Sequence, residues 1–298
     1  MAKILITGAN GFIGKSLLDY LIVNTDIQKK EILLLSSKKH EHFETLIYDR
    51  ESYSIPSIPN NIEGMIHLGA FTPKSSASSN DLYLNLGNII YTANLLKSVL
   101  SRIDRFIFIS TLDVYNSNKY IIAEKSPTDP ISLYGWSKLY CEQMIIKWCT
   151  KQQVPYQILR LGHIYGAGEE AYQKIIPITI KKVLTNQSPV IFSKGEEKRS
   201  FLNVKDCARM IWQSYNYPVT ESVVNIASNQ SYSILEIVNT IIQISGKDLK
   251  PEILNQPIAV RDYLFDNTLM RTLFGEEQIK LLDGLREEYK YFANLSDE

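Results

Sequence analysis

The chain has 298 residues, with 32 basic and 32 acidic side chains, so its formal net charge at pH 7 is zero. This balance excludes the basic surface that nucleic acids and anionic membranes select. Hydrophobic residues make up 45% and charged residues 21%, as in ordinary globular proteins. No apolar run is long enough for a transmembrane helix. We expect one large or two unequal domains with a sizeable core.

Cysteine and histidine usage gives no sign of a metal site. Cys141, Cys149 and Cys207 are an odd number of thiols without metal-ligand spacing. His40 and His42 lie in a charged segment typical of a solvated loop. The chain enters its first strand directly, without the features of a signal peptide. We therefore expect reduced, packed thiols in a cytoplasmic protein that holds no metal.

The first elements are a predicted strand over 2–6, a glycine-rich turn and a helix over 15–23. Glycine in such a turn permits a tight bend, close approach of backbone N–H groups to a phosphate, and close packing of helix on strand. Because a strand precedes and a helix follows, the motif predicts a dinucleotide site in preference to a purely structural turn. The expected cofactor contacts here are Gly8, Asn10, Gly11, Phe12, Ile13 and Gly14.

The second predicted strand, 31–35, ends in Ser36, Ser37, Lys38 and Lys39. A dinucleotide fold contacts the adenosine ribose at this point. An acidic residue here would accept a hydrogen bond from the 2′-hydroxyl of NAD, whereas small polar and basic residues suit the 2′-phosphate of NADP. The sequence therefore favours NADP(H) over NAD(H), with Ser36, Ser37 and Lys38 as ligands. The alternative is that both lysines are solvated loop charges.

Two further strand ends complete the expected cofactor site. A short strand over 45–48 leads to Asp49, a candidate partner for the adenine amine, and a buried strand over 64–70 ends in small residues. The expected contacts at that second end are Leu68, Gly69 and Ala70. Ligands of open α/β sheets bind beyond the carboxyl ends of strands, so Thr72 in the following polar loop is a candidate substrate contact.

The remaining pattern predicts a doubly wound α/β fold. Helices are expected over 82–100 and 132–150 and strands over 105–111 and 154–161. Strands alternating with helices at this spacing indicate right-handed βαβ units and a parallel sheet. The later pattern is less regular. We expect a dinucleotide-binding domain over 1–165 with a return segment at about 201–228, and a smaller mixed α/β substrate-binding lobe from 166–200 and 229–298.

Tyr134 and Lys138 are four residues apart on a predicted helix, so they share one face. An ammonium group beside a phenol lowers the phenol's pKa from about 10. Such a tyrosine can exchange a proton with an alcohol or a carbonyl, Thr111 at a strand end can hold the reacting oxygen, and Lys138 can also bond the nicotinamide ribose. The spacing alone is common, with an amphipathic surface pair as the alternative. After a glycine motif and a Ser-Thr strand end it is a strong indication.

These segments together resemble the extended short-chain dehydrogenase/reductases, in particular the NAD(P)-dependent nucleotide-sugar epimerase/dehydratase group, over almost the whole chain. The motifs that carry the resemblance are Thr7–Gly14, His67–Ala70, Asn88 with Thr92–Leu96, Ser110–Tyr115, Tyr134 with Lys138, Arg160–Gly166 and Arg199–Asp206. The resemblance implies a Rossmann-type sheet, with Ser110 and Leu161 as further cofactor contacts. It also implies a homodimer formed through the helices near 82–100 and 132–150.

The resemblance further implies a nucleotide-diphosphate sugar as substrate, with hydride moving between nicotinamide and usually the sugar 4-carbon. Arg199 and Arg261 would clamp the pyrophosphate, because a guanidinium fork binds phosphate bidentately. The alternative for each arginine is a structural ion pair with a neighbouring acid. Those acids are Glu196, Glu197 and Asp262.

Two departures from the family pattern bear on the reaction. Sugar dehydratases carry an Asp-Glu pair after the active-site hydroxyl, where this chain has Leu112 and Asp113, so a 4,6-dehydratase is not expected. Asp113 is either a base near the substrate or a structural acid. His163 stands where the family usually has a substrate-binding Asn, as in some deoxysugar reductase-like members, and is either a ligand contact or a structural imidazole.

The leading hypothesis is a 4-keto-sugar-nucleotide reductase that uses NADPH. Tyr134 supplies the proton, Thr111 orients the oxygen and Lys138 tunes Tyr134. The alternative is a nucleotide-sugar 4-epimerase, which uses the same residues with a tightly retained NAD. A remote alternative, a non-catalytic NADP-binding regulator, is opposed by the intact set of three residues.

Overall fold

The computed structural model describes residues 2–99, 103–115, 121–218, 222–257, 260–276 and 278–296. The chain forms two compact units. The first comprises Met1–Asn116, Pro127–Leu161 and Cys207–Asn225, and the second comprises Ser117–Ser126, Gly162–Asp206 and Ile226–Glu298. The chain thus enters the second unit briefly at Ser117–Ser126, enters it again after Leu161, and returns to the first unit from Cys207 to Asn225. The expected division, with a dinucleotide-binding domain over 1–165 and about 201–228, stays a prediction.

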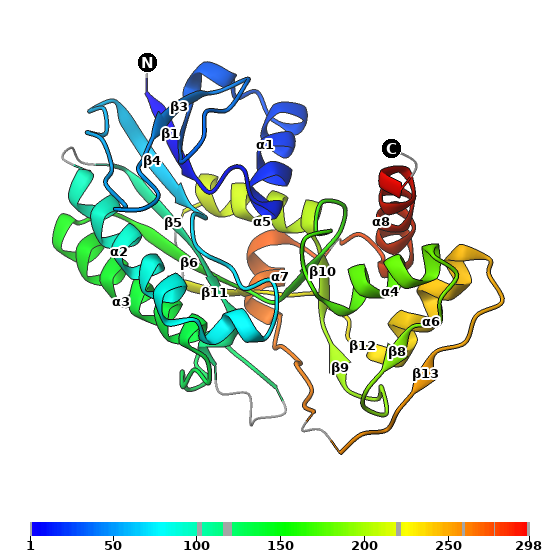
Figure 1. The fold of residues 1–298 in the computed structure, drawn as a ribbon. Coiled ribbons are helices and arrows are strands. Elements are labelled where there is room, and N and C mark those ends of the chain that lie inside the picture. Colours follow the sequence, from blue (N-terminus) through cyan, green and yellow to red (C-terminus); the bar gives the residue numbers. More distant parts are fainter. Residues whose placement is uncertain are drawn as a thin grey trace. The chain divides into compact units, whose positions relative to one another are not determined.

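The first unit contains a seven-stranded sheet with helices on both faces (Figure 1). Along the sheet, the strands are β11 (Val223–Ile226), β6 (Tyr156–Leu161), β5 (Arg105–Thr111), β4 (Ile62–His67), β1 (Lys3–Thr7), β2 (Ile32–Ser36) and β3 (Glu44–Ile47). The helices are α1 (Phe12–Asn24), α2 (Leu82–Ser98), α3 (Leu133–Gln152) and most of α5 (Val204–Asn216). Short 3-10 turns are η1 (Lys29–Glu31), η2 (Ala77–Asn80) and η3 (Leu112–Val114).

The sheet is buried on both faces, as parallel sheets are. All five residues of β2 are buried, and the pairings from β3 through β2, β1, β4 and β5 to β6 are parallel. Because β1 lies between β2 and β4, the strand order reverses at β1. Ligands of such sheets bind at the carboxyl ends of the strands beside this reversal. The doubly wound fold predicted from the sequence is confirmed.

Helices α2 and α3 lie side by side on one face of the sheet (Figure 1). They share an apolar cluster with alternate residues of the strands, because successive strand side chains point to opposite faces. Its members include Leu5, Leu33, Met65, Tyr91, Leu95, Phe106, Cys141, Ile145 and Ile158. Among the described residues, Cys141, Cys149 and Cys207 are buried and none of them forms a disulfide.

The second unit contains α4 (Ile175–Leu184), α6 (Ile234–Ser245), α7 (Thr268–Phe274) and α8 (Leu281–Ser296). In two-stranded sheets β7 (His163–Tyr165) pairs with β10 (Phe201–Asn203), β9 (Lys198–Arg199) with β12 (Tyr232–Ser233), and β8 (Val190–Ile191) with β13 (Glu252–Ile253). Helices α4, α6 and α8 share an apolar core that includes Ile180, Ile237, Ile241 and Leu285.

The pattern after residue 165 is too irregular to show most of these short strands or α7, although the apolar run 190–192 predicts a strand where β8 forms. Strands of two or three residues are too short for an alternating pattern to show. Helix α5 begins at Val204, directly after β10.

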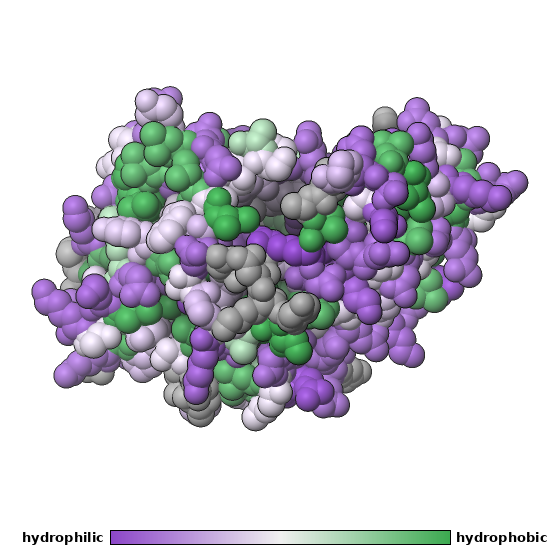
Figure 2. Space-filling view, turned by 90° about the horizontal axis from the view of Figure 1, so that it is seen from below, coloured by the Kyte–Doolittle hydropathy of each residue, from purple (hydrophilic) through white to green (hydrophobic). Residues whose placement is uncertain are grey.

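No helix among the described residues is long and apolar enough to cross a membrane. On the face drawn in Figure 2, apolar residues gather in separate groups among polar ones. Helices α2 and α3 nevertheless expose large apolar side chains, because Tyr83, Trp136 and Tyr140 are 83%, 51% and 57% exposed.

Candidate active site

The glycine turn lies where the strand order reverses. Gly8 has a φ of +74°, and a Cβ on it would lie 2.6 Å from the backbone nitrogen of Gly69. A Cβ on Gly14 would collide with the Gly8 carbonyl. Gly11 is the N-cap of α1 and has no side chain to cover the helix N-terminus, a site that favours phosphate. The cradle therefore fits a dinucleotide diphosphate. Phe12 and Ile13 are half-buried in the first turn of α1.

The carboxyl ends of β1 and β2 meet through side chains. Ser36 Oγ accepts hydrogen bonds from Asn10 Nδ2 at 2.9 Å and from the Lys38 backbone nitrogen at 3.3 Å. Ser37 bonds Tyr48. The structure thus brings Asn10, Ser36 and Lys38 together. Their contact with a cofactor stays a prediction. This cluster contains no carboxylate.

Asp49, the expected adenine contact, has both carboxylate oxygens engaged in its own turn. They accept hydrogen bonds from the Glu51 backbone nitrogen at 2.9 Å and from Ser52 Oγ at 2.6 Å. These bonds lower the pKa of Asp49, whose carboxyl is fully exposed. The local bonds give Asp49 a turn-forming role.

Thr7 fixes the small residues after β4. The Gly69 backbone nitrogen donates to Thr7 Oγ1 at 2.8 Å, and the buried His67 ring lies between Thr7 Oγ1 and Thr92 Oγ1 at 2.7 and 3.1 Å. Burial, with a smaller contribution from the charge of Lys138, lowers the pKa of His67 to about 3. A neutral imidazole therefore holds the end of β4, where Leu68 and Ala70 are half-buried.

Asn88 of α2 ties the next loop to the tyrosine helix. Its Oδ1 accepts from the Phe71 backbone nitrogen at 2.6 Å, and its Nδ2 donates to the Phe71 carbonyl at 3.2 Å and to Ser137 Oγ at 3.1 Å. The sequence gives Asn88 only as part of a family motif. Thr72, the expected substrate contact, follows in this loop and is exposed.

Thr111 and Tyr134 belong to segments that pack directly on each other. Thr111 ends β5, and its Oγ1 accepts from the Asp113 backbone nitrogen at 3.2 Å. Tyr134 is 7% exposed in the first turn of α3. The next residue, Gly135, packs so closely that a Cβ would collide with the Asp113 carbonyl. Glycine at position 135 therefore lets the helical turn that carries Tyr134 approach the segment after Thr111. The sequence did not predict this role of Gly135.

Lys138 lies one turn further along α3 and is 3% exposed. Its ammonium group lies 4.2 Å from the centre of the Phe108 ring, within the range of a cation–π interaction. Burial lowers the pKa of Lys138 to about 8, while Cys141 and Glu142 oppose that shift. Lys138 forms no ion pair within 4 Å among the described residues. It is therefore a buried cation that can act on a nearby phenol.

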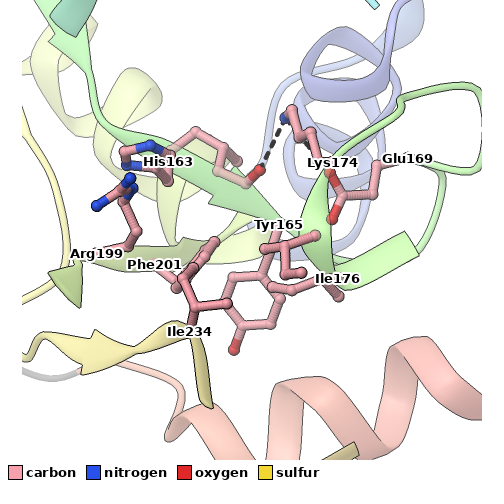
Figure 3. A pocket seen from close by; sticks show the side chains of 10 residues that line it. His163, Tyr165, Glu169, Lys174, Ile176, Arg199, Phe201 and Ile234 are labelled. Carbon is pink, nitrogen blue, oxygen red and sulfur yellow. Dashed lines mark hydrogen bonds and ion pairs between the residues drawn. The ribbon is translucent and has the colours of Figure 1, made fainter. Parts of the chain in front are cut away.

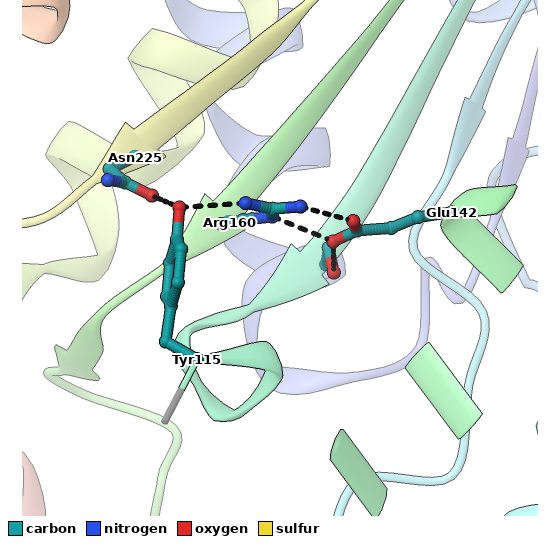
Figure 4. A network of polar contacts seen from close by, with 5 residues as sticks. Tyr115, Glu142, Arg160 and Asn225 are labelled. Carbon is teal, nitrogen blue, oxygen red and sulfur yellow. Dashed lines mark hydrogen bonds and ion pairs between the residues drawn. The ribbon is translucent and has the colours of Figure 1, made fainter. Parts of the chain in front are cut away.

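A buried network fixes the frame behind these groups (Figure 4). Arg160 donates to both oxygens of Glu142, from Nε at 3.0 Å and from Nη2 at 2.6 Å. Its Nη1 donates to Tyr115 Oη at 2.8 Å, and that hydroxyl donates to Asn225 Oδ1 at 2.8 Å. Ser110, an expected cofactor contact, donates its hydroxyl to Glu142 at 2.5 Å. The network thereby joins β5, α3, β6 and β11.

The sequence carried a signal for this network. Arg160 is the only charged residue in the predicted strand 154–161, and it needs an acidic partner, because charged residues are rarely buried unpaired. Glu142 was not identified as that partner. Leu161, the remaining expected cofactor contact, ends β6 and is 5% exposed.

The second unit contains a pocket of about 260 Å³. His163 and Arg199 lie on one side of it and Lys174 and Glu169 on the other (Figure 3). The pocket is lined by His163, Ile164, Tyr165, Glu169, Lys174, Ile175, Ile176, Arg199, Phe201 and Ile234. Basic groups above an apolar floor suit a ligand that carries both phosphate and a flat ring.

Arg199 and Arg261 lie together over Tyr263. Their guanidinium carbons are 4.9 and 4.7 Å from the centre of that ring, and Arg199 Nη1 donates to the Arg261 carbonyl at 2.5 Å. Within the described residues neither guanidinium forms an ion pair with Asp262, which accepts from the Lys198 backbone nitrogen at 2.7 Å. The arrangement therefore leaves two adjacent cations for an anionic ligand. Arg261 lies beside the pocket and not in its lining.

His163 lies between two aromatic rings, 5.7 Å from Phe201 and 5.2 Å from Tyr263. Its Nδ1 is buried and has no hydrogen-bond partner among the described residues. Burial, with the charges of Arg199 and Lys174, lowers the pKa of His163 to about 3. The ring is thus neutral, with a nitrogen left for a ligand. No group of three or more His, Cys, Asp or Glu in the described part of the chain could hold a metal ion.

Comparisons with known proteins agree with this architecture. Residues 4–227 match the model of the NAD dependent epimerase/dehydratase family. A putative UDP-glucose 4-epimerase of Methanocaldococcus jannaschii is 30% identical over 98% of both chains. A trifunctional dehydratase, epimerase and UDP-4-keto-L-rhamnose reductase of Arabidopsis thaliana is 25% identical over 98% of this chain and 47% of its own.

Among solved structures, the UDP-glucuronic acid 4-epimerase of Bacillus cereus, in complex with UDP-glucuronic acid and NAD, superposes with a TM-score of 0.83. It is 25% identical, and the match covers 98% of this chain and 99% of that one. The glycine cradle, the Tyr134–Lys138 helix and these matches together assign the chain, an enzyme, to the NAD-dependent epimerase/dehydratase family.

Proposed function

We propose that the protein is a UDP-sugar 4-epimerase that retains NAD. The observation that carries the proposal is similarity over the full length to a putative UDP-glucose 4-epimerase and to the B. cereus 4-epimerase. Leu112, in place of the acid that sugar dehydratases use, argues against a 4,6-dehydratase. These similarities favour the epimerase over the reductase that led on sequence grounds.

The proposed chemistry assigns one role to each of Thr111, Tyr134 and Lys138 in the first unit. A nicotinamide cofactor, held through its diphosphate by the glycine turn at Gly8, Gly11 and Gly14, would supply reversible hydride transfer at the sugar 4-carbon. Tyr134 takes the proton of the 4-hydroxyl and gives it back, acting as general base and then general acid. Thr111 holds the reacting oxygen through its hydroxyl. Lys138 stays charged below about pH 8 and stabilises the phenolate of Tyr134.

NAD is the cofactor that the solved relative holds, and it fits the glycine cradle. NADP remains the second candidate, because the cluster of Asn10, Ser36 and Lys38 contains no carboxylate to accept from a ribose 2′-hydroxyl. A 4-keto reductase using NADPH is the second candidate function on the same ground.

In the second unit, the pocket is proposed to hold the nucleotide diphosphate. Arg199 lines it and Arg261 stands beside it, so the two cations suit the two phosphates. His163 would offer its unpartnered Nδ1 to the same ligand.

A second copy of the chain is proposed to cover α2 and α3. A groove there is lined almost entirely by apolar surface from Leu82, Leu86, Trp136 and Tyr140, with other residues. Exposed aromatic and aliphatic side chains on two adjacent helices form the kind of patch that buries in an interface. Sedimentation velocity of the purified protein tests this proposal, and we expect the sedimentation coefficient of a homodimer.

The test of function begins with the cofactor that the purified protein retains. Protein is dialysed and denatured, and the released nucleotide is identified by mass spectrometry. We expect NAD, together with conversion of UDP-glucose or UDP-glucuronic acid to its 4-epimer by proton NMR. Empty protein that consumes NADPH only with a 4-keto-sugar nucleotide would establish the reductase instead.

Tyr134→Phe serves as the catalytic control. It keeps the ring and removes the hydroxyl, so we expect a loss of about 100-fold or more in kcat with NAD still bound. Full activity in Tyr134→Phe would contradict the catalytic assignment and favour a binding protein.

A further inference from the structure

Two carboxyl groups face each other inside the second unit. Glu169 follows β7 and Glu288 lies on α8, and both side chains are wholly buried. The two groups are within hydrogen-bonding range of each other. Three of their four oxygens receive no well-formed hydrogen bond from the described residues. The fourth, Glu169 Oε2, accepts from Lys174 Nζ at 3.3 Å.

Two ionised carboxylates in this position would repel each other without screening by water. One proton between them removes the repulsion and gives the unsatisfied oxygens a hydrogen bond. Burial raises the pKa of Glu169, and burial together with the charge of Glu169 raises that of Glu288 well above its ordinary value. Lys174 opposes both shifts. The ion pair with Lys174 leaves the charge on Glu169 and the proton on Glu288.

Among the described residues, the other titratable groups that interact with the pair are two tyrosines. Tyr172, in the loop before α4, interacts with Glu169, and Tyr165 of β7 interacts with Glu288 and also with Asp206 of α5. The pKa values of both tyrosines are raised by burial, so they stay neutral. Lys174 is thus the cation that balances the pair: with one shared proton the three groups are neutral together, and without it they carry one negative charge.

One member of the pair, Glu169, lines the pocket, and Glu288 does not. Glu169 and Lys174 both line the pocket, with Lys174 Nζ also donating to the Ile164 carbonyl at 3.3 Å (Figure 3). Glu169 therefore fixes the position of a lysine whose side chain is 41% exposed. Any change in the charge of the pair acts on a ligand in the pocket across a short, partly dry path.

We propose that Glu169 and Glu288 form a one-proton pair that positions Lys174 at the pocket and couples the binding of an anionic ligand there to protonation. The coupling rests on the proposed function, which places the nucleotide diphosphate in this pocket. Loss of the shared proton puts a second negative charge on the pair and weakens diphosphate binding. Affinity therefore falls as pH rises through the titration of the pair, and binding above that pH takes up a proton.

The test is titration calorimetry with UDP-glucose, whose diphosphate does not itself titrate near neutral pH. Wild type and Glu288→Gln are compared from about pH 6 to 8.5, in buffers of different ionisation enthalpy that report proton uptake. We expect wild-type affinity to fall by up to about tenfold per pH unit within the titration, and the variant, which keeps a donor for Glu169, to show no such fall. Glu287→Gln, an exposed neighbour paired with Lys205, should keep the wild-type profile.

Glu169→Gln is the second variant, in case Glu288→Gln does not fold. It also removes one acid, so we expect a flat profile, and weaker binding because Lys174 loses its partner. Equal pH profiles in wild type and either variant would overturn the proposal.

A measurement without nucleotide separates this proposal from the proposed function. Because the native state holds the shared proton, wild-type stability should fall as pH rises above the ordinary glutamate pKa, and Glu288→Gln should lack that fall. Wild type that never binds UDP-glucose would contradict the proposed function and the coupling, while this unfolding difference would still establish the pair. Binding with no unfolding difference would overturn the pair alone.

Discussion

The two units each bury a carboxylate with a cation, but they do so in opposite ways. In the first unit, Glu142 receives donors at both oxygens, from Arg160 and Ser110. In the second unit, three of the four oxygens of Glu169 and Glu288 have no well-formed hydrogen bond, and the single ion pair, from Lys174, reaches Glu169 only. A carboxylate whose oxygens already accept hydrogen bonds from a cation stays ionised. Two buried carboxyl groups that lack hydrogen-bond donors instead retain a proton. The first cluster is a rigid brace and the second can titrate.

The largest expected effect comes from breaking the brace. Glu142→Gln removes the only negative charge in contact with Arg160 among the described residues and leaves a buried cation uncompensated. We expect a loss of about 3–5 kcal/mol in the free energy of unfolding, measured by urea denaturation. Glu287→Gln, at the surface, should cost less than about 1 kcal/mol. A similar small loss in Glu142→Gln would mean that the network is not a brace.

Gly135→Ala tests the same rigid region through packing. The added methyl group meets the Asp113 carbonyl, so the tyrosine turn has to move away from the segment after Thr111. A displacement of about 1 Å at a reacting group costs about 100-fold in rate, so we expect kcat to fall by that order with KM little changed. Lys147→Ala, an exposed site on the same helix outside the proposed dimer groove, controls for helix propensity. Unchanged kcat in Gly135→Ala would exclude a tight requirement at this contact.

Lys174→Met tests the titratable region by removing its cation while keeping the aliphatic stem. We expect UDP to bind about tenfold more weakly, the scale of one charge-assisted hydrogen bond, with uridine binding unchanged. Exposed Lys194 offers the matched control Lys194→Met. Equal losses for UDP and uridine would mean that Lys174 does not act on the phosphates.

The smallest expected effect is on the pH dependence of the catalytic rate, through Lys138 in the first unit. Lys138 carries a pKa of about 8, so its charge is present below that pH and is lost as pH rises through it. The rate with saturating substrate should therefore fall by about half near pH 8. Lys138→Arg keeps its charge at high pH and should lack this decline, whatever its absolute rate. A profile that is flat to pH 9 or more in wild type would contradict the role of Lys138.

Local patterns explain what the sequence could predict. The glycine turn, the cluster at Ser36 and Lys38, and the helix that carries Tyr134 and Lys138 each lie within a short stretch. Their local patterns, taken together in chain order, therefore predict them. The pairing of Glu142 with Arg160, and of Glu169 with Glu288, joins separate elements that only folding brings together. The strands of two or three residues in the second unit likewise form only through partners far away in the sequence.

The sequence could not distinguish the reductase from the epimerase, for a different reason. Thr111, Tyr134 and Lys138 are common to the reductase and the epimerase, so the leading hypothesis rested on the absence of an acid after β2. That feature concerns the adenosine end of the cofactor, not the sugar. The comparisons support the alternative, the 4-epimerase, and the NADP preference is not confirmed.

The brace also constrains how this sequence can change over generations. Replacing Glu142 alone leaves Arg160 as a buried, uncompensated charge, and replacing Arg160 alone does the same to Glu142. Each single substitution therefore lowers the stability of the fold. A paired change to apolar residues of similar volume avoids that intermediate and can be neutral. Substitutions at positions 142 and 160, which are 18 residues apart, should therefore be correlated among relatives. That covariation would indicate the contact, which the variation at either position alone does not.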